Sequence, residues 1–214
     1  MKISTTRTET FSDGVMAIII TIMALEILPE VKADVSNQEV IDHLLKLLPK
    51  FVAYVLSFLM ISILWINHHH MFHLLEGTDE GLLLQNLFFL FWISLIPMAT
   101  STLGANPFAE ISVALYGFIM LMTTLSLTLM RVRIRKQNLV HKDQDKNLTK
   151  KINKVSLKAK TKSLIGTLSY LLSIPLAFVN IYASFICFLI PPIIFFIPDG
   201  IDDEKLAEKI AEKN

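Results

Sequence analysis

The sequence predicts an all-α integral membrane protein with six transmembrane helices per subunit, and three observations support this fold class. Of its 214 residues, 53% are hydrophobic and only 18% are charged, whereas soluble domains carry about 25% charged residues. The hydrophobic residues form long uncharged runs rather than the one-sided stripes of a soluble helix. The basic residues are concentrated in one segment. A disordered chain, an ordinary soluble enzyme and a disulfide scaffold all fit this composition poorly, and the single cysteine forms no intramolecular disulfide.

The first four hydrophobic runs each match one bilayer crossing, which takes about 20 apolar residues. The first run, 15–28, is interrupted only by Thr21 and Glu26, and the second, 51–66, only by serines and a tyrosine. The third and fourth contain no charged residue. These runs predict helices over about 7–28, 50–72, 82–104 and 109–130.

The last uncharged run, 164–198, is too long for one crossing and long enough for two short ones. Pro175, Asn180 and the Pro191–Pro192 pair interrupt it, and we place the turn near 179–182. The run therefore predicts two helices, over about 160–179 and 182–198, which complete a six-helix transmembrane domain over 1–198.

The charge distribution predicts how the helices are oriented. The segment 131–162 holds 12 of the 20 Lys and Arg residues and two acids, a local net charge of +10, while the remainder carries −9. Because positive loops stay on the cytoplasmic side, this basic loop and the start of the fifth helix are expected there, against anionic lipid head groups. Six helices then place both termini, including the tail 199–214, on the cytoplasmic side of the cell membrane. The loop 29–50 would lie outside.

The first helix carries the most informative pattern. At about 100° per residue, five residues fall on one face, with Thr21 at its margin: Phe11, Gly14, Ile18, Ile22 and Leu25. Asp13 lies about 140° from Ile18, so that Asp13 and Ser12 would point into the protein. Several copies of this helix around an axis would stack apolar rings with one hydroxyl layer. Ordinary packing inside the bundle is the alternative use of the same face.

The segment that opens this helix, Arg7-x-x-x-Phe11-Ser12-Asp13-Gly14, resembles the signature of the endolysosomal transmembrane potassium channel family and its bacterial six-helix members. A Trp and His cluster at the end of the second helix and a basic loop after the fourth extend the resemblance over the whole chain. The resemblance implies a homotetramer in which the first helix of each subunit lines a central potassium-conducting pore. No carbonyl filter motif of the Thr-Val-Gly-Tyr-Gly type is present.

The resemblance also implies roles for individual residues. The family's apolar constriction falls on Ile18, Ile22 and Leu25, the residues that helical geometry places on one face, and its hydroxyl layer falls on Thr21. Arg7, Phe11, Ser12 and Asp13 are implied as packing and hydrogen-bonding residues that hold the pore helix.

An apolar ring gates an ion pathway either by steric closure or by expelling water from the neck. Four Thr21 hydroxyls offer ligands to a partly dehydrated ion, so modest potassium selectivity is expected. Glu26, in the outer vestibule together with the acidic 29–50 loop, would concentrate cations at the mouth.

A histidine cluster, His68 to His73, ends the second helix. His69 and His73 are four residues apart and His70 and His73 three apart, so either pair shares a helical face. Three readings remain open from the residues: hydrogen bonding to buried Asp13 and Ser12, interfacial anchoring, or proton and metal binding once a carboxylate joins the histidines. The resemblance favours the hydrogen-bonding network for His69, His70 and His73.

A proton- or metal-coupled secondary transporter, using Asp13 and the His68–His73 cluster, is the alternative function. Transporters show broken helices near mid-membrane, and the first helix has no break between 15 and 28. We expect no enzyme, because the chain lacks a phosphate loop, a nucleophile elbow and a zincin motif. We also expect no cofactor, no bound metal and no nucleic acid, with K+ as the permeant ion.

Overall fold

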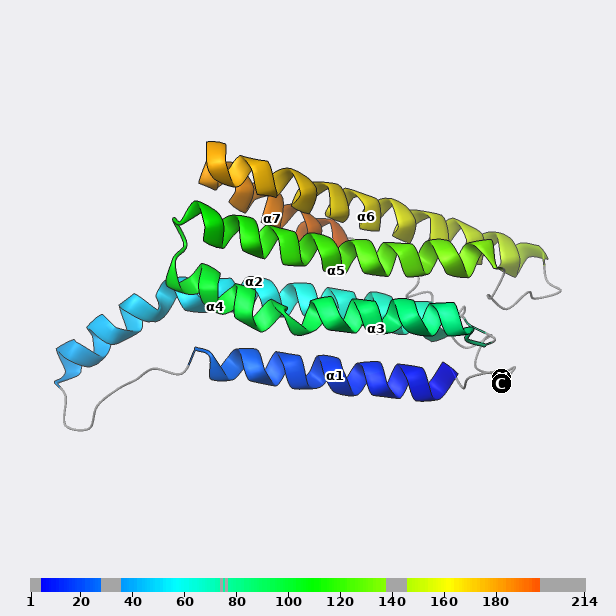
Figure 1. Cartoon of the computed structure of the whole chain (residues 1–214), viewed down its shortest axis with the longest axis horizontal. Coiled ribbons are helices and arrows are strands. Elements are labelled where there is room, and N and C mark those ends of the chain that lie inside the picture. The colour runs from blue at the N-terminus through cyan, green and yellow to red at the C-terminus, as the bar shows by residue number, and fades with distance from the viewer. Residues whose placement is uncertain (1–4, 28–35, 74, 76, 138–145, 197–214) are drawn as a thin grey trace.

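The chain folds into an elongated bundle of α-helices (Figure 1). Apart from isolated bridge residues, all regular secondary structure in the described residues is helical. This computed structural model describes residues 5–27, 36–73, 75, 77–137 and 146–196, without the side chains of 146–160 and 196. The helices are α1 (Thr5–Leu25), α2 (Asn37–His73), α3 (Glu80–Ser94), α4 (Ile96–Ala105), α5 (Glu110–Lys136), α6 (Lys146–Val179) and α7 (Ile181–Phe196).

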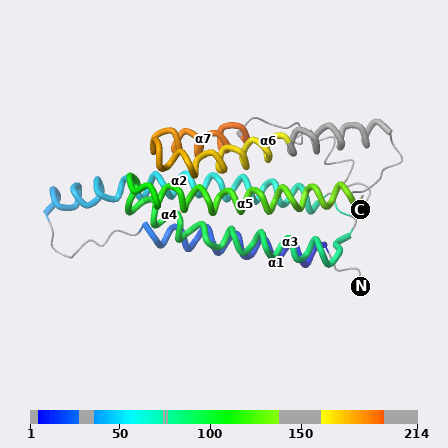
Figure 2. The backbone as a smooth tube through the Cα atoms, turned by 45° about the horizontal axis from the view of Figure 1, so that its top comes forward, coloured from blue at the N-terminus to red at the C-terminus, as the bar shows by residue number. Residues whose placement is uncertain are grey.

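The helices run up and down in alternation, and α1 lies at one edge of the bundle. It packs against α2, α3 and α4, whereas α6 and α7 pack against each other and against α5. Figures 1 and 2 both place α1 and the α6–α7 pair on opposite sides, with α2 and α5 between them. One side of α1 therefore faces away from the rest of the subunit.

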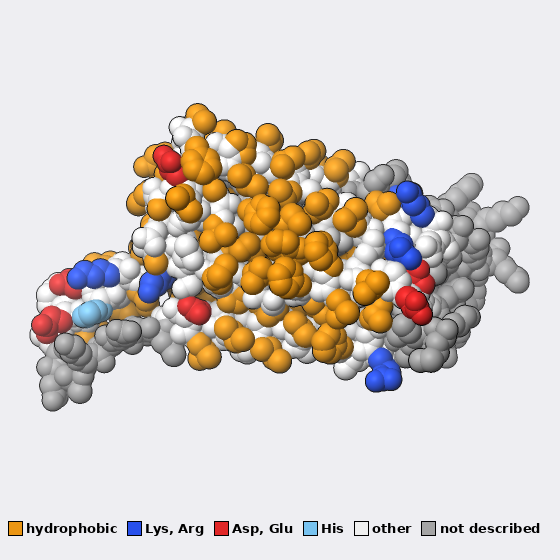
Figure 3. Space-filling view, viewed as in Figure 1, with side chains coloured by type: hydrophobic (Ala, Val, Ile, Leu, Met, Phe, Trp, Pro, Cys, Tyr) orange, Lys and Arg blue, Asp and Glu red, His pale blue; other side chains and the backbone are white. Residues whose placement is uncertain are grey.

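Five helical segments of the described chain are long and apolar enough to cross a membrane, with α3 and α4 together forming one of them over 80–105. The helix α7 is a shorter apolar helix of 16 residues. Figure 3 shows hydrophobic side chains covering the middle of the molecule, with charged side chains gathered towards its two ends. This is the surface of a multi-pass protein that has lipid around its middle, and the predicted all-α membrane fold is confirmed.

The third predicted helix, 82–104, is broken in the structure. It consists of α3 and α4, separated at Leu95, with a proline in the first turn of α4. Because Pro97 has no N–H to donate, the helical hydrogen-bond ladder is interrupted there. Asp79 fixes the start of α3 by accepting a hydrogen bond from the N–H of Leu82 at 2.9 Å. Together the two helices cover 80–105, which includes the predicted 82–104, and Pro97 accounts for the break within this run.

The second predicted helix begins 13 residues earlier than the expected 50, so part of the 29–50 segment is helical rather than loop. The cause is a capping box: Ser36 Oγ accepts from the N–H of Glu39, whose carboxylate accepts from the N–H of Ser36 at 2.8 Å. Pro49 lies inside α2, and prolines inside helices bend them. Figure 1 shows the first part of α2 projecting away from the bundle.

Much of the predicted basic loop, 131–162, is also helical, since α5 continues to Lys136 and α6 starts at Lys146. The side chain of Arg131 donates to Asn67 of α2 and to Ser163 of α6. Arg131 therefore links α2, α5 and α6 through hydrogen bonds, in addition to its contribution to the positive charge of this segment. The break between α6 and α7 falls at Asn180, inside the predicted turn, and the Asn180 side chain caps α7 by accepting from Tyr182 N–H at 3.0 Å.

The predicted tail, 199–214, lies outside the described residues.

An ion pair between Asp79 and Arg133 joins the start of α3 to the end of α5, with Nη2 donating to Oδ2 at 2.6 Å. The Arg133 guanidinium holds the pKa of the Asp79 carboxyl below its ordinary value of 3.8. Because the folded-state pKa is lowered, the pair stabilises the fold at higher pH and this contribution is lost as the pH falls below 3.8.

We predict that Asp79→Asn lowers the melting temperature at neutral pH by a few degrees and flattens its acid dependence. The measurement is thermal unfolding in detergent at neutral pH and below 3.8. Glu80→Gln, a charge removal at the exposed neighbouring position, is the control and should leave the acid dependence intact. An unchanged pH profile in Asp79→Asn would contradict the assignment.

Candidate functional site

The helix α1 has two distinct faces. One face is buried against α2, α3 and α4 and contains Met16, Ile19 and Met23, which are at most 4% exposed. The other face is uncovered in the subunit: Ile18 is 59% exposed, Ile22 43% and Leu25 64%. These three residues are the predicted constriction, and ordinary packing within the subunit, the alternative use of this face, does not occur.

The uncovered face borders a groove of about 610 Å³ between α1 and α4. Ile18 and Ile22 line it from α1, and Ser101 and Thr102 line it from α4. Glu26 follows directly after the last residue of α1 and lines the same groove. The groove therefore combines apolar side chains with hydroxyls and one carboxylate near its end.

Thr21 is exposed between the isoleucines, and its hydroxyl donates to the Ile18 carbonyl at 2.7 Å. This contact occupies the hydroxyl proton and leaves the lone pairs of Oγ1 available as acceptors. An oxygen in this state is suited to a cation rather than to an anion.

The buried face of α1 carries a polar chain that crosses three helices. The Ser12 hydroxyl accepts from Asn86 Nδ2 at 2.9 Å, and Asn86 Oδ1 lies 2.8 Å from His68 Nε2. All three residues are 0% exposed. Ser12 also donates to the Thr8 carbonyl at 2.8 Å. The network joins α1, α2 and α3 at one level of the bundle.

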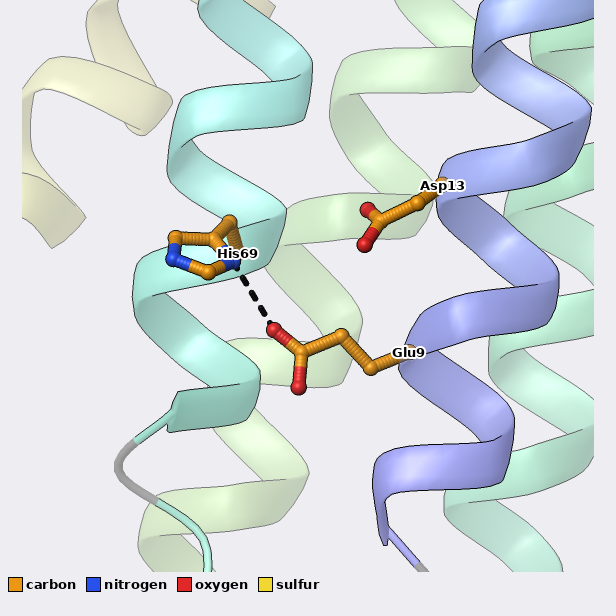
Figure 4. A group of neighbouring side chains, drawn as sticks. All are labelled: Glu9, Asp13 and His69. Atoms are coloured by element: carbon orange, nitrogen blue, oxygen red, sulfur yellow. Dashed lines mark ion pairs between the residues drawn. The ribbon is translucent and has the colours of Figure 1, made fainter.

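A second polar group lies beside this network, between α1 and α2 (Figure 4). Trp65 Nε1 donates to Asp13 Oδ1 at 2.9 Å, and His69 Nδ1 lies 2.8 Å from Glu9 Oε1. Figure 4 shows the Glu9 and Asp13 side chains directed from α1 towards His69 on α2. The α1 carboxylates and the α2 ring therefore meet across the helix interface.

The predicted contact of histidines with Ser12 and Asp13 is wrong in its details. The direct partner of Ser12 is Asn86, and that of Asp13 is Trp65, while the histidine that reaches Ser12 through Asn86 is His68. The physical reason is that α3 packs against α1 as well. An amide supplies both the donor for Ser12 and an acceptor facing His68, so it bridges the two.

The remaining predicted residues of the network take other positions. Arg7 and Phe11 are exposed on α1, His70 packs at an angle to His69 with ring centroids 6.0 Å apart, and His73 is exposed at the end of α2. Sequence reasoning missed Asn86 and Glu9 as members of the site. The signal for Asn86 was its polar amide within a long uncharged, mostly apolar run, because an amide buried there requires a hydrogen-bond partner.

The fold and site define a class: an all-α, multi-pass membrane protein whose first helix is held by buried polar contacts on one face and leaves an apolar face uncovered. Residues 7–97 match the family described as the endosomal/lysosomal potassium channel TMEM175. A potassium channel of Chryseobacterium sp. (strain P1-3) is 36% identical over 203 residues, which are 94% of this chain and 97% of that protein.

The chain belongs to the TMEM175 family, and the resemblance of its sequence to that family is confirmed.

Two further comparisons concern a solved structure and a human relative. The crystal structure of a lysosomal potassium-selective channel TMEM175 homolog from Chamaesiphon minutus matches with a TM-score of 0.73 at 25% identity, covering 91% of this chain and 97% of that one. The human endosomal/lysosomal proton channel TMEM175 is 28% identical over 108 residues, which are 50% of this chain and 21% of that protein.

Proposed function

We propose that the protein is a passive, potassium-preferring cation channel of the cell membrane. Four copies would surround an axis, with α1 of each lining the pore. The observation that carries this proposal is the uncovered face of α1, where Ile18, Ile22 and Leu25 are exposed although the opposite face is fully packed. A large uncovered apolar face that lies beside hydroxyls and a carboxylate is explained by an aqueous path between subunits better than by lipid.

In this arrangement, conduction is controlled by an apolar neck instead of a carbonyl filter. Rings of Ile18, Ile22 and Leu25 side chains would narrow the path and exclude water when closed. The Thr21 oxygens would supply ligands to a partly dehydrated K+ ion, and conduction would need no cofactor. Glu26, exposed beyond the neck, would raise the local cation concentration. The basic residues at the opposite end favour a cytoplasmic side for both termini, with the positive charges against anionic lipid.

A coupled transporter is the second candidate, and one observation favours it. The break at Leu95 between α3 and α4 lies beside the groove, which Pro97 and Ser101 line, and broken helices form substrate sites in transporters. The uninterrupted α1 favours the channel. Alternating access in a transporter needs a helix that can close one side of the path while the other side opens, and the continuous α1 has no break for such a movement.

The two candidates are separated by flux measurements on the full-length protein reconstituted in liposomes and planar bilayers. A channel gives single-channel steps under a K+ gradient and a current that follows the K+ reversal potential. We expect such steps, with smaller currents in Na+. A pH gradient without K+ tests protons, the ion named for the human relative. Saturable K+ flux strictly coupled to protons would overturn the channel proposal.

A further inference from the structure

Three potential metal ligands meet where the first part of α1 faces the last turns of α2. They are Glu9, Asp13 and His69, and one ligand atom from each lies within 4.8 Å of the other two. Figure 4 shows both carboxylates directed towards the imidazole ring. Two helices therefore contribute to the group, and its geometry depends on the fold rather than on adjacent residues in the chain.

The imidazole nitrogen in this group lacks a hydrogen bond. His69 Nδ1 lies 2.8 Å from Glu9 Oε1, but it is closed to solvent and has no aligned hydrogen-bond partner among the described residues. When the neutral ring carries its proton on Nε2, Nδ1 presents its lone pair to the Glu9 carboxylate, which is repulsive, and buried polar atoms without partners are costly. A cation between the two atoms removes the repulsion and gives each of them a partner.

Surrounding contacts fix two of the three ligands. Trp65 donates to Asp13 Oδ1 at 2.9 Å and stacks on His69, with ring centroids 5.8 Å apart and planes 22° apart. His73 stacks on His69 as well, at 6.1 Å and 21°. Outer contacts of this type orient metal ligands and strengthen binding.

We propose that Glu9, Asp13 and His69 bind one zinc-class divalent cation per subunit and thereby clamp α1 to α2. One imidazole and two carboxylates, with a water in the fourth position, form a ligand set that suits Zn²⁺. Zinc bonds of about 2.0–2.2 Å would hold the ligand atoms at about 3.3 Å from one another. The His69–Glu9 pair, now 2.8 Å apart, would therefore open slightly, and any pair near the 4.8 Å limit would close. The His69 side chain is 44% exposed, which leaves the ring edge open as an entry path.

The structure supplies the carboxylate ligands that the histidine spacing alone lacked. A metal site in this cluster required a carboxylate, and α1 contributes two, Glu9 and Asp13. Because both helices supply ligands, an ion that binds the folded bundle stabilises it by linkage. The proposal stands without the channel, since binding and stabilisation are measured on the purified protein in the absence of any current.

The test is a titration of the chelator-treated, full-length protein in detergent. Zn²⁺ binding is measured by calorimetry and by thermal unfolding, and Co²⁺ is used as a visible-absorption probe of the ligand geometry. We expect saturable binding at one ion per subunit, a higher melting temperature, and little effect of Mg²⁺. His69→Ala and the near-isosteric Glu9→Gln should each abolish saturable binding. Trp65→Phe, which keeps the stacking but loses the N–H, should weaken binding about tenfold.

His43→Ala is the matched control, because His43 is an exposed histidine near the other end of α2. It should bind Zn²⁺ as the unaltered protein does. Equal Zn²⁺ binding by the unaltered protein, His69→Ala and Glu9→Gln would overturn the proposal, as would the absence of saturable binding in the unaltered protein. Glu9→Gln serves as the second variant if His69→Ala fails to fold.

Discussion

Ile18→Ala and Ile22→Ala are expected to raise the unitary potassium current at least about twofold and to lower the preference for K+ over Na+. In the proposed tetramer each substitution widens a ring by four side chains at once, because every subunit contributes the same residue. A wider neck retains water more easily, so the ion sheds less of its shell and is discriminated less. The measurements are single-channel conductance and the reversal potential with K+ on one side and Na+ on the other.

Because Ile18 and Ile22 are exposed, effects of their truncation on conduction can be separated from effects on folding. Ile18 and Ile22 are 59% and 43% exposed in the subunit, so shortening them leaves no cavity in the subunit core and should spare folding. Ile19, at 4% exposed, is the opposite case, and its truncation would cost stability instead.

Ile186→Ala is the matched control for the isoleucine variants. Ile186 lies on α7 and is 63% exposed, and α7 packs against α6, α2 and α5 rather than beside α1. The same chemical change at a position away from the proposed pore should leave conductance and selectivity as they were. Unaltered currents in both α1 variants would place the ion path elsewhere in the molecule.

The α1 example shows what the sequence predicts well. A strict helical period separates Ile18, Ile22 and Leu25 from Ser12 and Asp13, and the structure separates them in the same way, with the first set exposed and Ser12 buried. Periodicity determines a face because side-chain direction follows directly from residue number in a helix. The division of the long C-terminal run at Asn180 was equally predictable, since an asparagine side chain caps the following helix.

The partners across helix interfaces were less predictable, because they depend on packing and not on spacing. Nothing in the sequence says that Asn86 of α3, rather than a histidine of α2, contacts Ser12, or that Trp65 donates to Asp13. The early start of α2 had a local signal in the sequence, the Ser36-to-Glu39 capping box, which uncharged runs alone do not reveal. The break at Leu95 had one as well, in Pro97.

The second large effect is expected at Asn86, whose replacement by alanine should lower the melting temperature by several degrees and reduce the yield of folded protein. Asn86 is the one hydrogen-bond partner of the buried His68 ring among the described residues, because His68 Nδ1 has none there. Phe72 and Phe89 stack on the ring and offer no replacement. An unsatisfied buried polar group costs about 1–3 kcal/mol. Thermal unfolding in detergent measures the loss.

Gln85→Ala is the matched control, because Gln85 precedes Asn86 on α3 and its buried Oε1 has no hydrogen-bond partner among the described residues. Its truncation therefore loses packing but no hydrogen bond at that oxygen.

A double variant, His68→Phe with Asn86→Leu, removes both polar partners, and replacing a pair by apolar groups is far less costly than removing one member. The double variant should thus be more stable than Asn86→Ala. If Gln85→Ala and Asn86→Ala are equally destabilised, the Ser12–Asn86–His68 chain does not hold α1 in place. Position-specific destabilisation would identify that chain as the anchor from which the proposed pore face of α1 is presented.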